Sequence, residues 1–345
     1  MFRFPRLAGA AATALALALL AAPATAAGEP TTLTDPRIVA HFDLARGQTP
    51  ENIALEPDGS ANLTMALARQ VVRVSKDGQH RRRLATLPRV ENPATPVIGV
   101  AAVFGIVRTH DGTLYVTYGT GTEETGIWRI HRRGGTPEQV ACLPPNGFPN
   151  GLALDEHRGH LYAADSVLGT VWRVALKDIH HRDDGDCVRP TAWATGPALS
   201  RTNFIGANGI KVHKGAVWVS NLDKGTLLRI PVRRDGTAGT ARIRATGLTG
   251  IDDFAFAGRG DTAIATLITQ NQVVLVRPDG THTVALTRDD GLSSPTSAAV
   301  RGRTVYIPSA AFLTESDPNL LLARLTHKGH KGEKGDKDKD HDKRP

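Results

Sequence analysis

The chain has 345 residues, of which 40% are hydrophobic and 22% charged, with 35 Gly, 21 Pro and only 2 Cys. This composition excludes a collagen, a disordered chain and a disulfide-stapled miniprotein, and it favours many short strands over long helices. The net charge of +8 is no sign of nucleic-acid binding, because half of it lies in the two terminal segments and no RNA- or DNA-binding motif accompanies it.

The first 26 residues have the pattern of an export signal. Arg3 and Arg6 precede an apolar run over residues 7–22, and residues 24–26 supply small side chains for cleavage. The run is short for a membrane span, and no second candidate follows it. We therefore expect a secreted protein, extracellular or periplasmic, with no membrane contact after cleavage. An uncleaved N-terminal anchor is the alternative.

Six copies of one pattern fill the mature chain. Each copy has a turn, a short apolar alternation with a period of two, a second turn and further strands. The copies begin at Pro50, Val103, Phe148, Gly206, Gly250 and Ser294. Repeats of about four strands cannot bury a face alone and stack radially. We predict an all-β fold, a six-bladed β-propeller within residues 27–325.

The two ends of the repeat array are incomplete in a complementary way. The sixth repeat offers three strands, over residues 296–300, 304–308 and 320–325, while an unpaired strand over 38–44 precedes the first repeat. Pairing that strand with the last blade would close the ring and cover an exposed edge. We expect this closure in a monomer. Residues 326–345 are charged and almost free of apolar side chains, which predicts a disordered tail.

The two cysteines, Cys142 and Cys187, are too few for a zinc site and have no partner residues for nucleophilic catalysis. Export would place them in an oxidising compartment, where paired cysteines usually form a disulfide. Both a bridge and two free thiols remain open at this point.

Aligning the repeats on their first strand places one residue at its start in every blade. These residues are Glu51, Phe104, Asn150, Asn208, Asp252 and Thr296. The innermost strands of a propeller line its central channel, so these side chains should meet at one end of it. Carboxylate and amide oxygens suit a divalent cation, and we expect Ca²⁺. The predicted metal ligands are Glu51, Asn150, Asn208 and Asp252, and Phe104 and Thr296 would border a substrate pocket.

Asn followed by Gly is also a turn signal. On that alternative, Asn150-Gly151 and Asn208-Gly209 would cap their loops, and Glu51 would be a surface residue.

The segments PENIAL, PNGLALD, ANGIKV and GIDDFAF, together with LYAADS, resemble the senescence marker protein/gluconolactonase family, also called regucalcin-like. Its relatives include paraoxonases and strictosidine synthase-like proteins. The resemblance covers residues 35–325 and implies a six-bladed propeller with one divalent metal, usually Ca²⁺, that polarises a lactone or ester carbonyl. It places the family's metal ligands on Glu51, Asn150, Asn208 and Asp252. Phe104 stands where members often have Asn or His, which suggests an apolar wall.

We therefore expect a secreted, metal-dependent hydrolase of lactones or related esters, in which Asp252 or Asp253 takes the proton of a water molecule. Its partner would be a small-molecule substrate. The alternative from another class is a non-catalytic propeller that binds a small molecule or a protein, with a structural metal in its channel. A condensing enzyme of the strictosidine synthase type is a third possibility, for which the sequence places no catalytic Glu.

Overall fold

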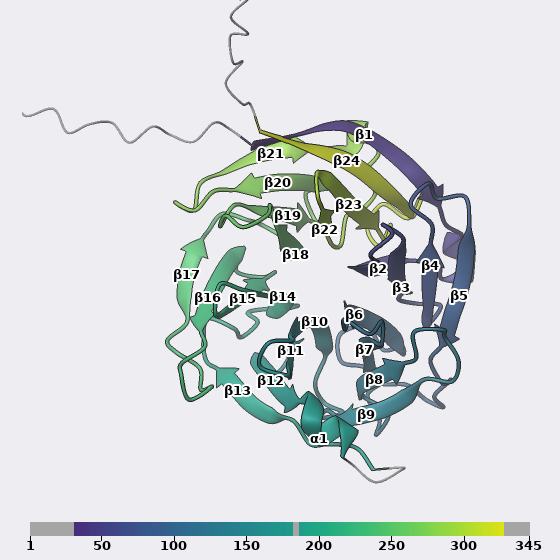
Figure 1. The fold of residues 1–345 in the computed structure, drawn as a ribbon, viewed down its shortest axis with the longest axis vertical. Coiled ribbons are helices and arrows are strands. Elements are labelled where there is room, and N and C mark those ends of the chain that lie inside the picture. Colours follow the sequence, from purple (N-terminus) through teal and green to yellow (C-terminus); the bar gives the residue numbers. More distant parts are fainter. Residues whose placement is uncertain (1–30, 182–185, 328–345) are drawn as a thin grey trace, which may run out of the picture. The chain divides into compact units, whose positions relative to one another are not determined.

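Short strands of alternating apolar residues, many joined by Gly-containing turns, are the main regular elements of this computed structural model, which describes residues 31–181 and 186–327. The strands form six four-stranded antiparallel sheets arranged around a central axis (Figure 1). The predicted six-bladed β-propeller is confirmed. The predicted export signal and the predicted tail beyond His327 lie outside the described residues. Thr326 and His327, assigned to the tail from the sequence, end the last strand instead.

Each of the first three blades is built from four strands that follow one another in the chain, from the channel outwards. Blade 1 comprises β2 (Pro50–Leu55), β3 (Ala61–Met65), β4 (Gln70–Val74) and β5 (Arg81–Thr86). Blade 2 comprises β6 (Ala102–Arg108), β7 (Leu114–Gly119), β8 (Gly126–Ile130) and β9 (Glu138–Cys142). Blade 3 comprises β10 (Pro149–Asp155), β11 (His160–Asp165), β12 (Thr170–Ala175) and β13 (Thr191–Thr195). A short helix, α1 (Leu176–His180), interrupts the path from β12 to β13.

Blades 4 and 5 repeat this order, and blade 6 departs from it. Blade 4 comprises β14 (Ala207–His213), β15 (Ala216–Asn221), β16 (Thr226–Pro231) and β17 (Arg242–Ala245). Blade 5 comprises β18 (Ile251–Phe256), β19 (Ala263–Leu267), β20 (Gln272–Val276) and β21 (His282–Leu286). Blade 6 comprises β22 (Ala299–Arg301), β23 (Thr304–Ser309), β24 (Asn319–His327) and, as its outer strand, β1 (Thr31–His41).

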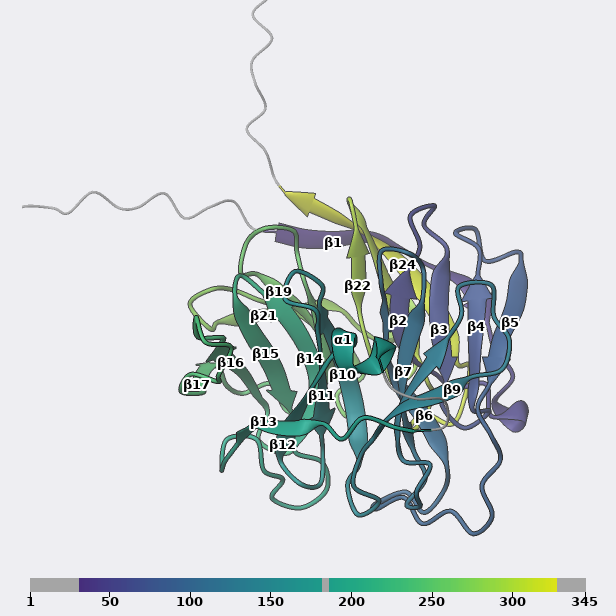
Figure 2. The same ribbon diagram turned by 60° about the horizontal axis from the view of Figure 1, so that its bottom comes forward.

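The N-terminal strand closes the ring, as predicted. β1 pairs antiparallel with β24 as the outermost strand of blade 6, and the tilted view shows the two running side by side (Figure 2). The strand begins earlier and ends earlier than the predicted 38–44. Asp35 has a positive φ of 52° ahead of Pro36, and the register shifts between Thr34 and Arg37, so the strand continues through a bulge that hides its alternation.

Neighbouring sheets pack face to face, and their apolar side chains form the cores between blades. One such core joins Val71 and Leu84 of blade 1 to Ile106 and Leu114 of blade 2, all of them buried. Because every sheet shares its two faces with its neighbours, both faces of every blade are covered only when the ring is complete. No helix in the described part of the chain is long and apolar enough to cross a membrane.

Cys142 and Cys187 form a disulfide, which settles the alternative left open by the sequence. Their Cα atoms are 5.5 Å apart. Cys187 belongs to the segment between α1 and β13 of blade 3, and Val188 exchanges backbone hydrogen bonds with Val140 and Cys142 on β9 of blade 2. The bridge therefore fixes a segment of blade 3 to the outer strand of its neighbour.

Replacing both Cys142 and Cys187 with Ser should destabilise the fold. The bridge closes a loop spanning 45 residues in the sequence, and the loss of its constraint on the unfolded chain is expected to cost roughly 3 to 4 kcal/mol. Guanidinium unfolding of the oxidised wild type and the double variant measures the difference. Equal midpoints, or two titratable thiols in the oxidised protein, would contradict the expectation.

Candidate functional site

The innermost strand of five blades carries a β-bulge at the position that the repeats align. The bulged pairs are Glu51-Asn52, Phe104-Gly105, Asn150-Gly151, Asn208-Gly209 and Asp252-Asp253. A bulge inserts one extra residue and redirects the side chains beside it. Asn150 and Asn208 therefore lie inside strands β10 and β14 rather than in loops. The alternative that these Asn-Gly pairs cap turns does not hold.

The glycines of three bulges allow neighbouring inner strands to touch backbone to backbone. A Cβ atom on Gly105 would lie 2.4 Å from the backbone nitrogen of Leu152, and one on Gly151 would lie 2.4 Å from the carbonyl oxygen of Asn208. A Cβ atom on Gly209 would lie 2.3 Å from a carboxylate oxygen of Asp253. The inner strands of blades 2 to 5 therefore pack against one another more closely than a side chain at these three positions would permit.

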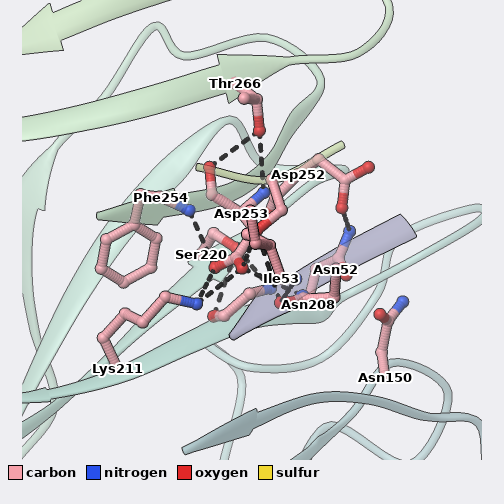
Figure 3. A network of polar contacts seen from close by, with 12 residues as sticks. Asn52, Ile53, Asn150, Asn208, Lys211, Ser220, Asp252, Asp253, Phe254 and Thr266 are labelled. Carbon is pink, nitrogen blue, oxygen red and sulfur yellow. Dashed lines mark hydrogen bonds and ion pairs between the residues drawn. The ribbon is translucent and has the colours of Figure 1, made fainter. Parts of the chain in front are cut away.

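Polar side chains fill the other half of the channel at the same level. Asp253 accepts hydrogen bonds from Asn52 Nδ2 at 3.1 Å and Ser297 Oγ at 2.8 Å, and Lys211 Nζ lies 2.7 and 2.6 Å from its two carboxylate oxygens. Figure 3 shows Asn52 and Lys211 approaching Asp253 from different strands. The negative charge of Asp253 is thus balanced by a Lys from the neighbouring blade.

Hydroxyl groups link each bulge to the next blade. Thr64 donates to the carbonyl of Phe104 at 2.6 Å, and Thr296 of blade 6 donates to the carbonyl of Pro50 at 3.0 Å. The same contact joins Thr117 to Asn150 and Ser220 to Asp252. Thr64, Thr117 and Ser220 were not predicted from the sequence, although a hydroxyl at this position of the second strand recurs in the repeats.

The predicted metal ligands lie at one end of the channel and line a cavity of about 330 Å³, together with Phe104. Glu51, Asn150, Asn208 and Asp252 are all buried. Asn208 Nδ2 donates to Asp252 Oδ1 at 2.9 Å, while Glu51 Oε2 and Asn208 Oδ1 are buried without a hydrogen-bond partner. Unsatisfied buried oxygens are costly, so this end of the channel has acceptors to offer a ligand.

Two residues assigned to the site from the sequence have other surroundings. Thr296 is fully buried and does not line the cavity, and its hydroxyl donates a hydrogen bond to the carbonyl oxygen of Pro50. Asp253 is also absent from the cavity lining because its carboxylate points to Lys211. Asp252 and Asp253 are adjacent in the chain and have opposite environments, one facing the cavity and one ion-paired.

Burial raises the pKa of both cavity carboxyls. The pKa of Glu51 rises from 4.5 to about 8, first through desolvation and then through the charge of Asp253. The pKa of Asp252 rises well above its ordinary value through desolvation, then through the charges of Glu51 and Asp253. A site that penalises negative charge so strongly is one that a bound cation would stabilise.

The donor set is one that a hard cation accepts. Two carboxylates and two amide oxygens supply charge and coordination without a soft ligand. No group of three or more His, Cys, Asp or Glu side chains able to hold a metal occurs among the described residues. The oxygen donors of this site therefore depend on the amides of Asn150 and Asn208 as well as on the two carboxyls.

Comparison with known proteins identifies solved structures of the same fold. An aldose sugar dehydrogenase from Streptomyces coelicolor, in its PQQ-bound form, is 13% identical with a TM-score of 0.63, over 86% of this chain and 100% of that one. A calcium-binding regucalcin from Agrobacterium tumefaciens is 15% identical with a TM-score of 0.59, over 84% and 93%. A gluconolactonase from Xanthomonas campestris is 15% identical with a TM-score of 0.57, over 87% and 98%.

These likenesses establish the fold. The resemblance predicted from the sequence is confirmed to this extent, since a regucalcin and a gluconolactonase are among the structural neighbours. No protein-family model matches the chain, and no curated protein matches its sequence.

In the presence of a chelator, the protein should lose thermal stability as the pH rises from about 5 to about 8. Because the pKa of Glu51 is higher in the fold than its ordinary 4.5, the folded state holds a proton that the unfolded state has released in this range, so stability falls with pH. Glu51→Gln cannot ionise and should flatten this dependence.

Melting curves across the pH range measure the effect, with Glu315→Gln, at an exposed position, as the matched control. If the melting midpoint of Glu51→Gln changed with pH as steeply as that of the wild type, the pKa of Glu51 would not be raised in the fold.

Proposed function

We propose that the protein is a secreted, metal-dependent hydrolase of lactones or related esters that works in the cavity at the end of the channel. The observation that carries this proposal is the pair of buried, unpartnered oxygens, Glu51 Oε2 and Asn208 Oδ1, beside a second carboxylate. Its support from outside the chain is the fold, shared with a gluconolactonase and a calcium-binding regucalcin.

Four side chains would hold the cation, for which we propose Ca²⁺. They are Glu51, Asn150, Asn208 and Asp252. Bound there, a divalent cation would supply Lewis-acid polarisation of a carbonyl oxygen and of water. The apolar side chains around the ligands keep bulk water away from the reacting groups.

Asp252 is the residue that we propose as the proton acceptor. It lines the cavity, and Asn208 fixes one of its oxygens at 2.9 Å. Figure 3 shows the other oxygen pointing away from Asn208. This second oxygen would accept the proton of a water molecule in the cavity. Asp253 would position the neighbouring strands through Lys211, Asn52 and Ser297 instead.

Secretion is supported by two features at different places in the chain. Residues 1–26 have the pattern of an export signal, and Cys142 and Cys187 are bridged, as is usual for proteins of oxidising compartments. The substrate is proposed to be a small molecule because the site is a cavity of about 330 Å³ at the end of the channel.

Calcium should stabilise the fold. A cation at about a hundred times its dissociation constant adds about 2.7 kcal/mol, which should raise the melting midpoint by a few degrees. Calorimetry with Ca²⁺ and with chelator measures this shift. Asn150→Ala and Asn208→Ala should each reduce it, whereas Asn203→Ala, at an exposed position, should not. Identical midpoints in Ca²⁺ and chelator would refute the metal site.

Asp252→Asn should abolish most of the hydrolysis at saturating Ca²⁺. The substitution keeps an oxygen ligand and nearly the same volume but removes the base, which typically costs 10² to 10⁴ in rate. Asp253→Asn is the matched control, and it should lower stability through the unbalanced Lys211 while leaving the rate of the folded protein near wild type.

Rates for lactones and aryl esters, per folded molecule, decide the point. If Asp252→Asn hydrolysed these substrates at the wild-type rate, Asp252 would not be the base. A wild type that hydrolyses nothing across the panel would favour the non-catalytic binding propeller.

A further inference from the structure

The wall of the cavity differs sharply from its polar floor. Beyond the four proposed ligands, Thr269 is the one polar residue that lines the cavity in the described part of the chain, and every other lining residue is apolar. No Lys, Arg or His lines it. A substrate rich in hydroxyl groups would therefore find few hydrogen-bond partners away from the ligand end.

An aromatic pair forms part of this wall. Phe104 occupies the aligned ring position of blade 2, where other blades carry oxygens, and it packs edge to face on Phe148 with ring centroids 4.8 Å apart. A Cβ atom on Gly119 would lie 3.4 Å from the Phe104 ring and 3.1 Å from Thr95. The Phe104 ring therefore packs close to Gly119.

The apolar wall continues to the protein surface. Leu67, Phe204 and Leu313 line the cavity and are 43%, 50% and 61% exposed. Val97 and Val100 flank Ile98, another lining residue, and are also exposed. These five belong to a set of only seven large hydrophobic residues that are exposed in residues 31–181 and 186–327. Their gathering around one opening marks a path for an apolar group.

We propose that the substrate is a lactone or ester with an unbranched alkyl chain, and that Phe104 and the apolar mouth select it against hydroxylated sugar lactones. This inference rests on the proposed function. The carbonyl lies at the polar floor, and the chain runs past Phe104 and Phe148 towards Leu313 at the mouth. Each methylene placed on this wall leaves water, and each hydroxyl placed there loses its partners.

A homologous series of γ-alkyl lactones tests the selection. kcat/KM should rise about fourfold per added methylene until the chain reaches the mouth, and glucono-δ-lactone should be at least about 100-fold poorer than the best member. Phe104→Asn and Leu313→Asn should each reduce the dependence of kcat/KM on the length of the alkyl chain.

Leu313 is exposed, so the Leu313→Asn variant keeps the test valid if Phe104→Asn fails to fold. Ile243→Asn, at an exposed site on β17, is the control and should change nothing.

Binding of the corresponding alkyl lactams, measured by calorimetry, provides a readout that needs no turnover. Affinity should rise with chain length in the wild type and less in Phe104→Asn. A flat chain-length profile in both assays, or preference for the sugar lactone, overturns the substrate class while leaving hydrolysis intact. Chain-dependent lactam binding without hydrolysis of any lactone or ester supports the apolar selection and overturns the proposed function.

Discussion

The close approach of the inner strands at the axis is the constraint on which the rest of the site depends. Gly105, Gly151 and Gly209 leave no room for a Cβ atom, so the inner strands of blades 2, 3, 4 and 5 meet through three close backbone contacts. Asp253 and its partners fill the remaining half of the channel. Because each bulge joins one residue of this layer to one residue of the cavity floor, the packing of the axis fixes where the floor side chains point.

Two adjacent aspartates show how the same residue type acquires different properties from its surroundings. Asp253 lies against Lys211, so its charge is balanced inside the protein. Asp252 lies beside a second carboxyl and two amides, and burial makes its ionised form unfavourable. The bulge separates the two, since it directs one side chain to the polar layer and the other to the cavity. The fold therefore balances the charge of Asp253 internally and leaves the carboxyl of Asp252 available to a ligand.

The number of blades and the residues of the floor could be predicted because they repeat with the period of the fold. The closing strand could be predicted because the sixth repeat lacks one strand and an unpaired strand precedes the first repeat. The meaning of Asn150-Gly151 could not be settled in the same way, since a turn and a bulge both favour Gly and only the neighbouring backbone distinguishes them. Lys211 was missed because its partner lies on the next blade, 42 residues away in the sequence. The apolar mouth was missed as well, because Phe204 and Leu313 come from loops that follow no repeat.

The seam between β1 and β24 joins the two ends of the described chain, with Thr31 opposite His327. During synthesis, at about 5 to 20 residues per second, β1 therefore emerges roughly 15 to 60 s before its partner strand exists. Until then blade 6 lacks its outer strand and blade 1 its neighbour, and the open edges are exposed to pairing with other chains. The ring can therefore close only once β24 has been made, and its open edges stay uncovered until then.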